Sequence, residues 1–218
     1  MEKLSLNSTR PDRMLGIQAI CGIVGPIIYA IVLTVLGSLW PGYNPISQYM
    51  SELGAVDAPH AIVMNVLGFQ LLGIFMIGYG SGLYRGISKG WDSKIGAALI
   101  IIAGVDMVMV GFFPCDPGCV NVSSTGIRHS ITATISSLAM TFGMLVVSLR
   151  LKKDSRWRSY WVFTLAFAVV TTFLSPLPTF PIFSPWAGLL QRLGMGLALF
   201  WMEVMSIRLL RLSIRSSA

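Results

Sequence analysis

Six long apolar segments, separated by short polar ones, dominate the pattern of this chain. Crossing the hydrocarbon core of a bilayer takes about 20 mostly apolar helical residues, and each segment is of that order. The pattern therefore predicts an all-α integral membrane protein, a six-transmembrane-helix bundle that forms a single domain over residues 1–218. The segments cover approximately residues 15–39, 61–84, 95–114, 131–149, 160–177 and 190–209, and residues 1–13 are expected to form a polar cytoplasmic tail.

The composition agrees with this class of protein. Of the 218 residues, 54% are hydrophobic and only 11% are charged, whereas a soluble domain carries about 25% charged residues. The first apolar segment is longer than the apolar core of a cleaved signal peptide, and no small-residue cleavage site follows it. We therefore expect it to remain as the first span.

Basic residues cluster in alternate polar segments. All but two of the 16 Lys and Arg residues lie before the first apolar segment, between the second and third, between the fourth and fifth, or after the sixth. In a six-span arrangement these stretches share one side of the membrane, so the positive-inside rule predicts a multi-pass cell-membrane protein with both termini in the cytoplasm. Topology accounts for the net charge of +7. We expect membrane lipid as a partner and no nucleic acid, and the sequence indicates no protein partner.

The first outer loop, residues 41–60, carries signals for a short helix of its own. Asn44 is a favourable N-cap, Pro45 suits the first helical position, and Gly54 is a favourable stop. Apolar residues recur between them at helical spacing, namely Ile46, Tyr49, Met50 and Leu53. The pattern predicts a short amphipathic helix.

Two interpretations of that helix remain open. It is either a surface helix in the membrane interface or a lid that folds over the end of the bundle. As a lid it would present Ser51 and Glu52 to a pocket beneath it.

The turn between the third and fourth segments concentrates the reactive side chains. It holds Cys115, Asp116, Cys119 and His129 on the predicted outer side. We expect a disulfide between Cys115 and Cys119, because that compartment permits oxidation and the intervening Asp-Pro-Gly can form a turn. A two-thiolate metal site is the less favoured alternative. No second cysteine pair and no H-x-x-x-H or H-E-x-x-H spacing supports it, so we expect neither a metal nor a cofactor.

Asp106 lies within the third apolar segment, where an ionisable side chain is costly and indicates a functional site. It should sit about 12 Å below the turn, given the 1.5 Å rise per helical residue. We expect Asp106 and His129 to line one cavity, closed from above by Ser51 or Glu52. The alternative is that Asp106 only fixes helix packing through hydroxyl groups such as that of Ser136.

These residues form the candidate site. The candidate catalytic residues are Asp106, His129, Glu52 and Ser51, and the further pocket residues are His60, Asn65, Asp116, Ser136 and Arg192. Three function classes remain open. They are an enzyme or binding protein for a lipid-like molecule near the outer leaflet, a small transporter or proton relay using Asp106, and a non-catalytic membrane subunit or sensor.

Four short motifs follow one another along the chain. They are Asn-Pro-Ile-Ser-Gln-Tyr-Met-Ser-Glu-Leu-Gly at 44–54, Asn65 with Gly68-Phe69, Gly-Phe-Phe-Pro-Cys-Asp at 111–116, and His129 opening the fourth segment. In order and spacing they resemble a family of uncharacterised prokaryotic membrane proteins, the domain of unknown function 998 (DUF998). The resemblance covers nearly the whole chain. It implies about six spans and no established activity, and we do not transfer the Cys115–Cys119 pair as a family feature.

Overall fold

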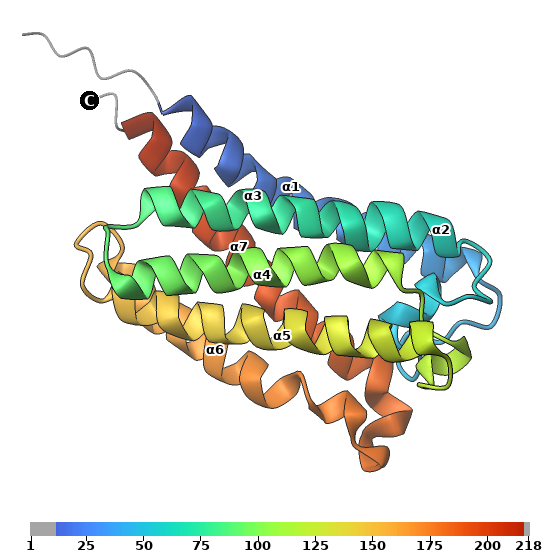
Figure 1. Cartoon of the computed structure of the whole chain (residues 1–218). Coiled ribbons are helices and arrows are strands. Elements are labelled where there is room, and N and C mark those ends of the chain that lie inside the picture. The colour runs from blue at the N-terminus through green and yellow to red at the C-terminus, as the bar shows by residue number, and fades with distance from the viewer. Residues whose placement is uncertain (1–11, 216–218) are drawn as a thin grey trace, which may run out of the picture.

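Within residues 12–215, which the computed structural model describes, six helices are long and apolar enough to cross a membrane (Figure 1). The prediction of an all-α membrane protein is confirmed. The second of these spans is continuous but carries a π-helical stretch near its start. The elements are α1 (Arg13–Leu39), α2 (Ala61–Val63) continued by η2 (Met64–Gln70) and α3 (Leu71–Gly86), α4 (Trp91–Phe112), α5 (Ser124–Leu151), α6 (Trp161–Leu174) and α7 (Ala187–Arg215).

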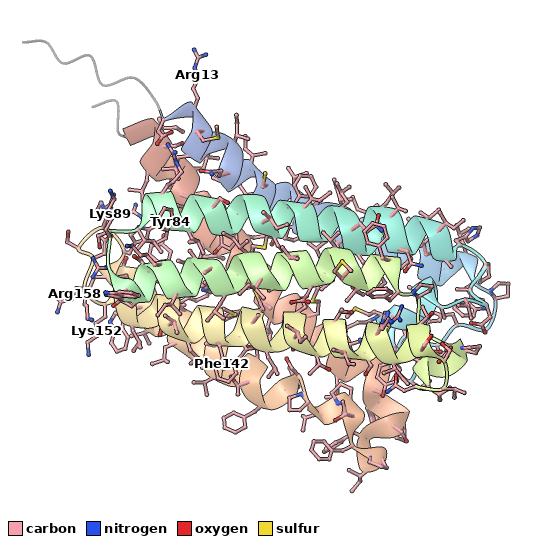
Figure 2. All side chains as sticks on the ribbon, viewed as in Figure 1. Arg13, Tyr84, Lys89, Phe142, Lys152 and Arg158 are labelled. Atoms are coloured by element: carbon pink, nitrogen blue, oxygen red, sulfur yellow. A yellow bond between two sulfur atoms is a disulfide. The ribbon has the colours of Figure 1, made fainter. Side chains whose placement is uncertain are left out.

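The bundle has two chemically different ends. Its basic end holds the start of α1, the end of α7 and the connections at 87–90 and 152–157 (Figure 1). Figure 2 shows labelled basic side chains at this end, namely Arg13, Lys89, Lys152 and Arg158. The opposite end, here the cysteine end, holds the connections at 40–60 and 113–123. Lys3, Arg10 and the first eleven residues of the expected tail lie outside the described residues.

Glycines allow the central helices to approach closely. A Cβ atom at Gly73 of α3 would lie 2.5 Å from the carbonyl oxygen of Gly104 of α4, and one at Gly104 would lie 2.8 Å from that of Gly73. The contact of α4 with α5 is similar, because a Cβ atom at Gly96 would lie 3.4 Å from the carbonyl oxygen of Gly143. Small residues at such crossings let backbones pack in a membrane, where the hydrophobic effect drives no helix association.

Large apolar side chains cover the outside of the bundle as well as its interior. Ile17, Ile31 and Phe173 are 58%, 57% and 72% exposed. In water this surface would be unstable, whereas in a bilayer it faces lipid tails. Some polar groups inside the bundle are paired with one another, as where the indole Nε1 of Trp201 donates to Thr164 Oγ1 at 3.0 Å.

A buried carboxylate joins the two connections at the basic end. Asp154 accepts hydrogen bonds from the backbone N–H of Ser88 at 2.8 Å and from the guanidinium of Arg156 at 3.0 Å. Arg150 crosses the same gap and donates to the carbonyl oxygen of Ser88 at 2.9 Å. Burial disfavours the charged carboxyl, but the Arg156 guanidinium and the N–H groups outweigh it and lower the pKa of Asp154 from 3.8 to about 2. Hydrogen bonds of charged side chains therefore hold the two connections together at this end.

The helix of the first loop is shorter than the sequence predicts. It is a 3₁₀ helix, η1, over Met50–Gly54. Asn44 closes a separate turn, because its side-chain Oδ1 accepts from the backbone N–H of Ile46 at 2.9 Å. Tyr49 between them has extended backbone, with ψ of 149°, and breaks the helix. Met50 and Leu53 are buried, so η1 packs into the end of the bundle instead of lying on its surface.

Candidate functional site, a cavity at the cysteine end

A cavity of about 690 Å³ opens among the helices in the half of the bundle nearer the cysteine end. Most of its lining comes from α5, α6 and α7, and η1 with parts of α1, α3 and α4 completes it. Among the described residues that line it there is no Asp, Glu, Lys or Arg. The cavity is therefore an uncharged space inside a membrane protein.

His129 is the titratable ring at the cavity wall. It lies in the second turn of α5, is only 5% exposed, and its Nδ1 lies 2.7 Å from the carbonyl oxygen of Phe113. A carbonyl oxygen can only accept, so Nδ1 carries the hydrogen and donates it. Nε2 is buried and has no hydrogen-bond partner. In the neutral ring Nε2 holds a free lone pair, which can accept a hydrogen bond, take a proton or bind a metal.

Ser51 and Gln191 also line this part of the cavity. The side-chain Nε2 of Gln191 donates to Ser51 Oγ at 3.3 Å, and its Oε1 accepts from the backbone N–H of Met50 at 2.6 Å. One amide of α7 therefore holds η1 over the bundle. The prediction that Ser51 borders a pocket beneath this loop agrees with this geometry.

Hydroxyl groups continue along the cavity wall. On α5 they follow one helical face at Ser130, Thr134, Ser137 and Thr141, and on α6 they are Thr171, Thr172 and Ser175. Ser136 also lines the cavity, and its Oγ donates to the carbonyl oxygen of Ala103 at 2.8 Å, which ties α5 to α4.

The wall farther from the cysteine end is apolar. It is made largely of Met76, Met107, Met140, Phe142, Ala198 and Leu199. From Ser130 to Phe142 the α5 wall extends about 18 Å, at 1.5 Å per residue. Unbranched methionine side chains adapt to irregular apolar partners. The cavity thus has its imidazole and amide groups near the cysteine end, and methionines predominate at depth beside hydroxyls such as that of Thr141.

One side of the cavity faces the surroundings of the bundle. Leu138 and Phe142 line it and are nevertheless 52% and 51% exposed. Figure 2 shows the labelled Phe142 on the outer surface of α5. In Figure 1 the end of α6 and the start of α7, in orange, lie away from α5, in yellow. The cavity is therefore bordered on this side by residues of the outer surface.

The cysteine turn lies against the same wall. Cys115 and Cys119 form a disulfide with Cα atoms 5.0 Å apart, and Cys119 lines the cavity. Asp116 between them accepts from the backbone N–H of Ser123 at 2.8 Å and from that of Val122 at 3.0 Å. Hydrogen bonds from the side chain and backbone of Ser123 hold the pKa of Asp116 below its usual range. Asp116 therefore orders the turn and does not line the cavity.

The two predicted catalytic carboxylates, Asp106 and Glu52, do not line the cavity. The prediction that Asp106 and His129 line one cavity is therefore wrong. Asp106 is half-buried on the face of α4 that carries Ile102 and Val105, both largely exposed, whereas Met107 and Val110 line the cavity. Consecutive helical residues are rotated by about 100°, which turns Asp106 away. Glu52 is buried within its own loop, where it accepts from the backbone N–H of Tyr49 at 2.8 Å.

The other predicted pocket residues also lie outside the lining. Asn65 is buried and donates from Nδ2 to the carbonyl oxygen of Gly54 at 3.0 Å. Arg192 donates to the carbonyl oxygens of Pro45 at 2.6 Å and Gln48 at 3.1 Å, so it fastens the first loop. His60 is exposed at the start of α2. Of the predicted site residues, His129, Ser51, Ser136 and Cys119 line the cavity.

Gln191 is the lining residue that the sequence prediction missed. An amide inside an apolar segment is costly and indicates a functional or packing role, so its position in the sixth segment was an available signal. Tyr29 of α1 also lines the cavity, and its hydroxyl lies 3.7 Å from the Sδ of Met50. No pattern in α1 distinguishes it from an ordinary core tyrosine.

An all-helical bundle with six apolar spans and a membrane-depth cavity defines a multi-pass membrane protein. The family model described as "Protein of unknown function (DUF998)" matches residues 23–208. The chain belongs to this family, as the resemblance implied. No curated protein and no solved structure matches it.

Proposed function

We propose that this membrane protein binds an uncharged lipid-like molecule in its cavity. The polar head lies beside His129, Ser51 and Gln191, and the apolar tail extends along the methionine wall. The observation that carries the proposal is the polarity gradient of a cavity whose lining has no charged residue. Ligand pockets are mostly apolar with a few convergent polar groups, which is the pattern here.

The absence of charged residues from the lining favours a bound molecule with an uncharged head group. An ionised phosphate or carboxylate would lose its hydration without gaining a cation, which is strongly unfavourable. The two basic residues of this end are engaged elsewhere. Arg192 binds loop carbonyl oxygens, and the guanidinium of Arg128 lies 5.8 Å from the ring centre of Phe113. An alcohol or ester head group therefore fits better than a phospholipid head group.

The free lone pair of His129 favours a hydroxyl-bearing head. Nε2 is a buried acceptor without a partner, and such a group costs free energy until it is satisfied. A ligand hydroxyl that donates to Nε2 supplies the missing hydrogen bond. Ser51 and Gln191 can bind a neighbouring oxygen of the same head.

Binding suits this geometry better than the other function classes do. The two carboxylates predicted as acid–base groups, Asp106 and Glu52, both lie outside the lining. The transporter or proton-relay alternative uses Asp106, which lies outside the lining. A lipid-binding subunit needs neither carboxylate in the cavity, so this function class agrees with the lining.

A matched pair of glycine variants on α7 tests the proposal. Gly194 lines the cavity, and a Cβ atom there would lie 3.4 Å from Ser175 Oγ and 3.6 Å from Ser175 Cα, which are ordinary contacts, so Gly194→Leu adds side-chain atoms at the cavity wall. Gly196 is two residues away with nothing within 4 Å of its Cβ position, so Gly196→Leu is the control. Native mass spectrometry of both proteins, purified in mild detergent, measures the bound lipid.

Wild type and Gly196→Leu should retain a neutral lipid such as a diacylglycerol or an isoprenoid alcohol. Gly194→Leu should lose most of it while keeping the same thermal unfolding midpoint. Retention of the same lipid by Gly194→Leu, or retention of anionic phospholipid alone by wild type, would contradict the proposal.

A further inference from the structure

We propose that Cys115, Cys119 and His129 form a Zn²⁺ site when the disulfide is reduced. One ligand atom from each of the three residues lies within 4.8 Å of the other two. The disulfide and the metal site use the same two sulfur atoms and therefore exclude each other. The cysteine end would then have two chemical states, one oxidised and metal-free and one reduced and metal-bound. The ion would occupy the Nε2 lone pair of His129 that a lipid head would otherwise bind, but the Zn²⁺ measurement needs no bound lipid.

His129 is already prepared as a ligand. Its Nδ1–H donates to the carbonyl oxygen of Phe113, which fixes the ring and directs the lone pair to Nε2. Zinc-bound histidines characteristically donate their other ring N–H to a carbonyl or carboxylate in this way. The side chain is 95% buried and Nε2 has no hydrogen-bond partner. This unpartnered nitrogen is a second observation, besides the two nearby cysteines, that indicates a metal site.

The sulfur positions need only a small change. Zinc bonds of about 2.3 Å to sulfur and 2.0–2.1 Å to nitrogen place tetrahedral ligand atoms about 3.5–3.8 Å apart, and the present ligand atoms lie within 4.8 Å of one another. Opening the S–S bond lets Cys119 move. It lies on a turn with Gly118, which has φ of +64° and nothing within 4 Å of its Cβ position. Cys115 is 2% exposed and its Sγ lies 3.4 Å from the carbonyl oxygen of Ser51, so it stays in place.

The charge balance suits a cavity without charged residues. Two thiolates neutralise Zn²⁺, so the complex adds no net charge to a poorly hydrated site. The three protein ligands leave the fourth tetrahedral position open, which is the arrangement of catalytic rather than structural zinc. Cys119 and His129 both line the cavity, so that position is accessible from it.

The redox step balances with a reductant from solution. A trialkylphosphine and one water molecule reduce the disulfide to two thiols and leave a phosphine oxide, and a dithiol can do the same by thiol exchange. Zn²⁺ then binds both sulfurs as thiolates, and the two protons pass to solvent. Exchange with an added low-molecular-weight disulfide, which takes up the two electrons and leaves as two thiolates, re-forms the Cys115–Cys119 bond and releases the ion.

The test uses the full chain in detergent micelles, before and after reduction with a phosphine. Zn²⁺ is added, unbound metal is removed by gel filtration, and metal per chain is measured by elemental mass spectrometry. We expect one Zn²⁺ per chain after reduction and none before it. Co²⁺ replacing Zn²⁺ should give a sulfur-to-metal charge-transfer band and the visible bands of a tetrahedral site.

Three variants separate this site from adventitious binding. Cys119→Ser should abolish the charge-transfer band of a two-thiolate site, and His129→Ala should weaken Zn²⁺ binding by at least about 10-fold. Cys21→Ser removes the remaining, free cysteine and should change neither result. The oxidised wild type is a folded control that needs no substitution. Equal Zn²⁺ binding by oxidised and reduced wild type, no binding after reduction, or unchanged affinity in a folded His129→Ala protein would overturn the proposal.

Discussion

The Nδ1 atom of His129 lies 2.7 Å from the carbonyl oxygen of Phe113. Phe113 caps the C-terminal end of α4, so this hydrogen bond joins it to the second turn of α5. The same bond sets the tautomer of the ring and leaves Nε2 as a buried acceptor. A structural contact and a chemical capability therefore depend on one side chain.

Removing that side chain should destabilise the bundle. We expect His129→Ala to lower the free energy of unfolding by about 1–3 kcal/mol, because the partly buried carbonyl of Phe113 loses its donor. Thermal unfolding in detergent measures the change. His60→Ala is the control, because His60 is exposed and makes no side-chain cap hydrogen bond. Equal midpoints for the two variants would show that the contact with Phe113 contributes nothing.

The basic end should weaken in acid. The pKa of Asp154 is lowered to about 2 from 3.8, so its contribution is complete above about pH 4 and is lost as the pH falls towards 2. A shift of this size corresponds to about 2 kcal/mol. Unfolding midpoints recorded between pH 2 and 5 should therefore fall more steeply for wild type than for Asp154→Asn, which is less stable at neutral pH. Parallel pH profiles would contradict this role.

Asp57→Asn is the control for that experiment. Asp57 lies exposed in the first loop, outside the apolar helices. The substitution should leave both the midpoint at neutral pH and its decline in acid within about 0.5 kcal/mol of wild type.

The cysteine turn depends on a glycine at the start of α5. A Cβ atom at Gly126 would collide with the carboxylate of Asp116. Gly126→Ala should therefore break the hydrogen bonds from Val122 and Ser123 and lower the unfolding midpoint. Gly196→Ala should be neutral or slightly stabilising, because nothing lies within 4 Å and alanine is the better helix former. A higher midpoint for Gly126→Ala than for wild type would refute the assignment.

Orientation in the membrane is still a prediction from charge. A cysteine in place of Val122, which is 80% exposed at the cysteine end, should react with an impermeant maleimide on intact cells. A cysteine in place of Lys152, which is exposed at the basic end, should react only after permeabilisation. The Cys21→Ser background removes the free thiol. Labelling of the Lys152 position on intact cells would show that the basic end faces outward and would contradict the predicted orientation.

Hydropathy predicts the spans well because each must cross a bilayer, and it predicts their ends less well. The fourth span begins at Ser124, not near residue 131, because Ser123 caps it and accepts from the backbone N–H of Gly126 at 3.0 Å. Those first residues are polar, so an apolar window excludes them. Capping chemistry, not hydropathy, places the start of α5.

The site was only partly predictable for a related reason. A helix that is apolar on every side gives no signal of which face it turns inward, so Asp106 and Met107 could not be told apart from sequence. Gln191 bonds Ser51 from 140 residues away, and no local pattern reveals such a partner. His129 was predictable because it lies near the start of a span and close to the cysteines in the sequence.

The proposed neutral lipid lies in the cavity and not on the general surface of the bundle. The most direct measurement is cross-linking with a photoactivatable neutral lipid, a diazirine-bearing diacylglycerol, followed by peptide mapping. If the lipid binds in the cavity, we expect adducts on lining residues such as Met107, Met140 and Met195. These adducts should be lost in Gly194→Leu but not in Gly196→Leu. Adducts spread evenly over outward-facing residues such as Ile17 and Ile31, unaffected by Gly194→Leu, would contradict it.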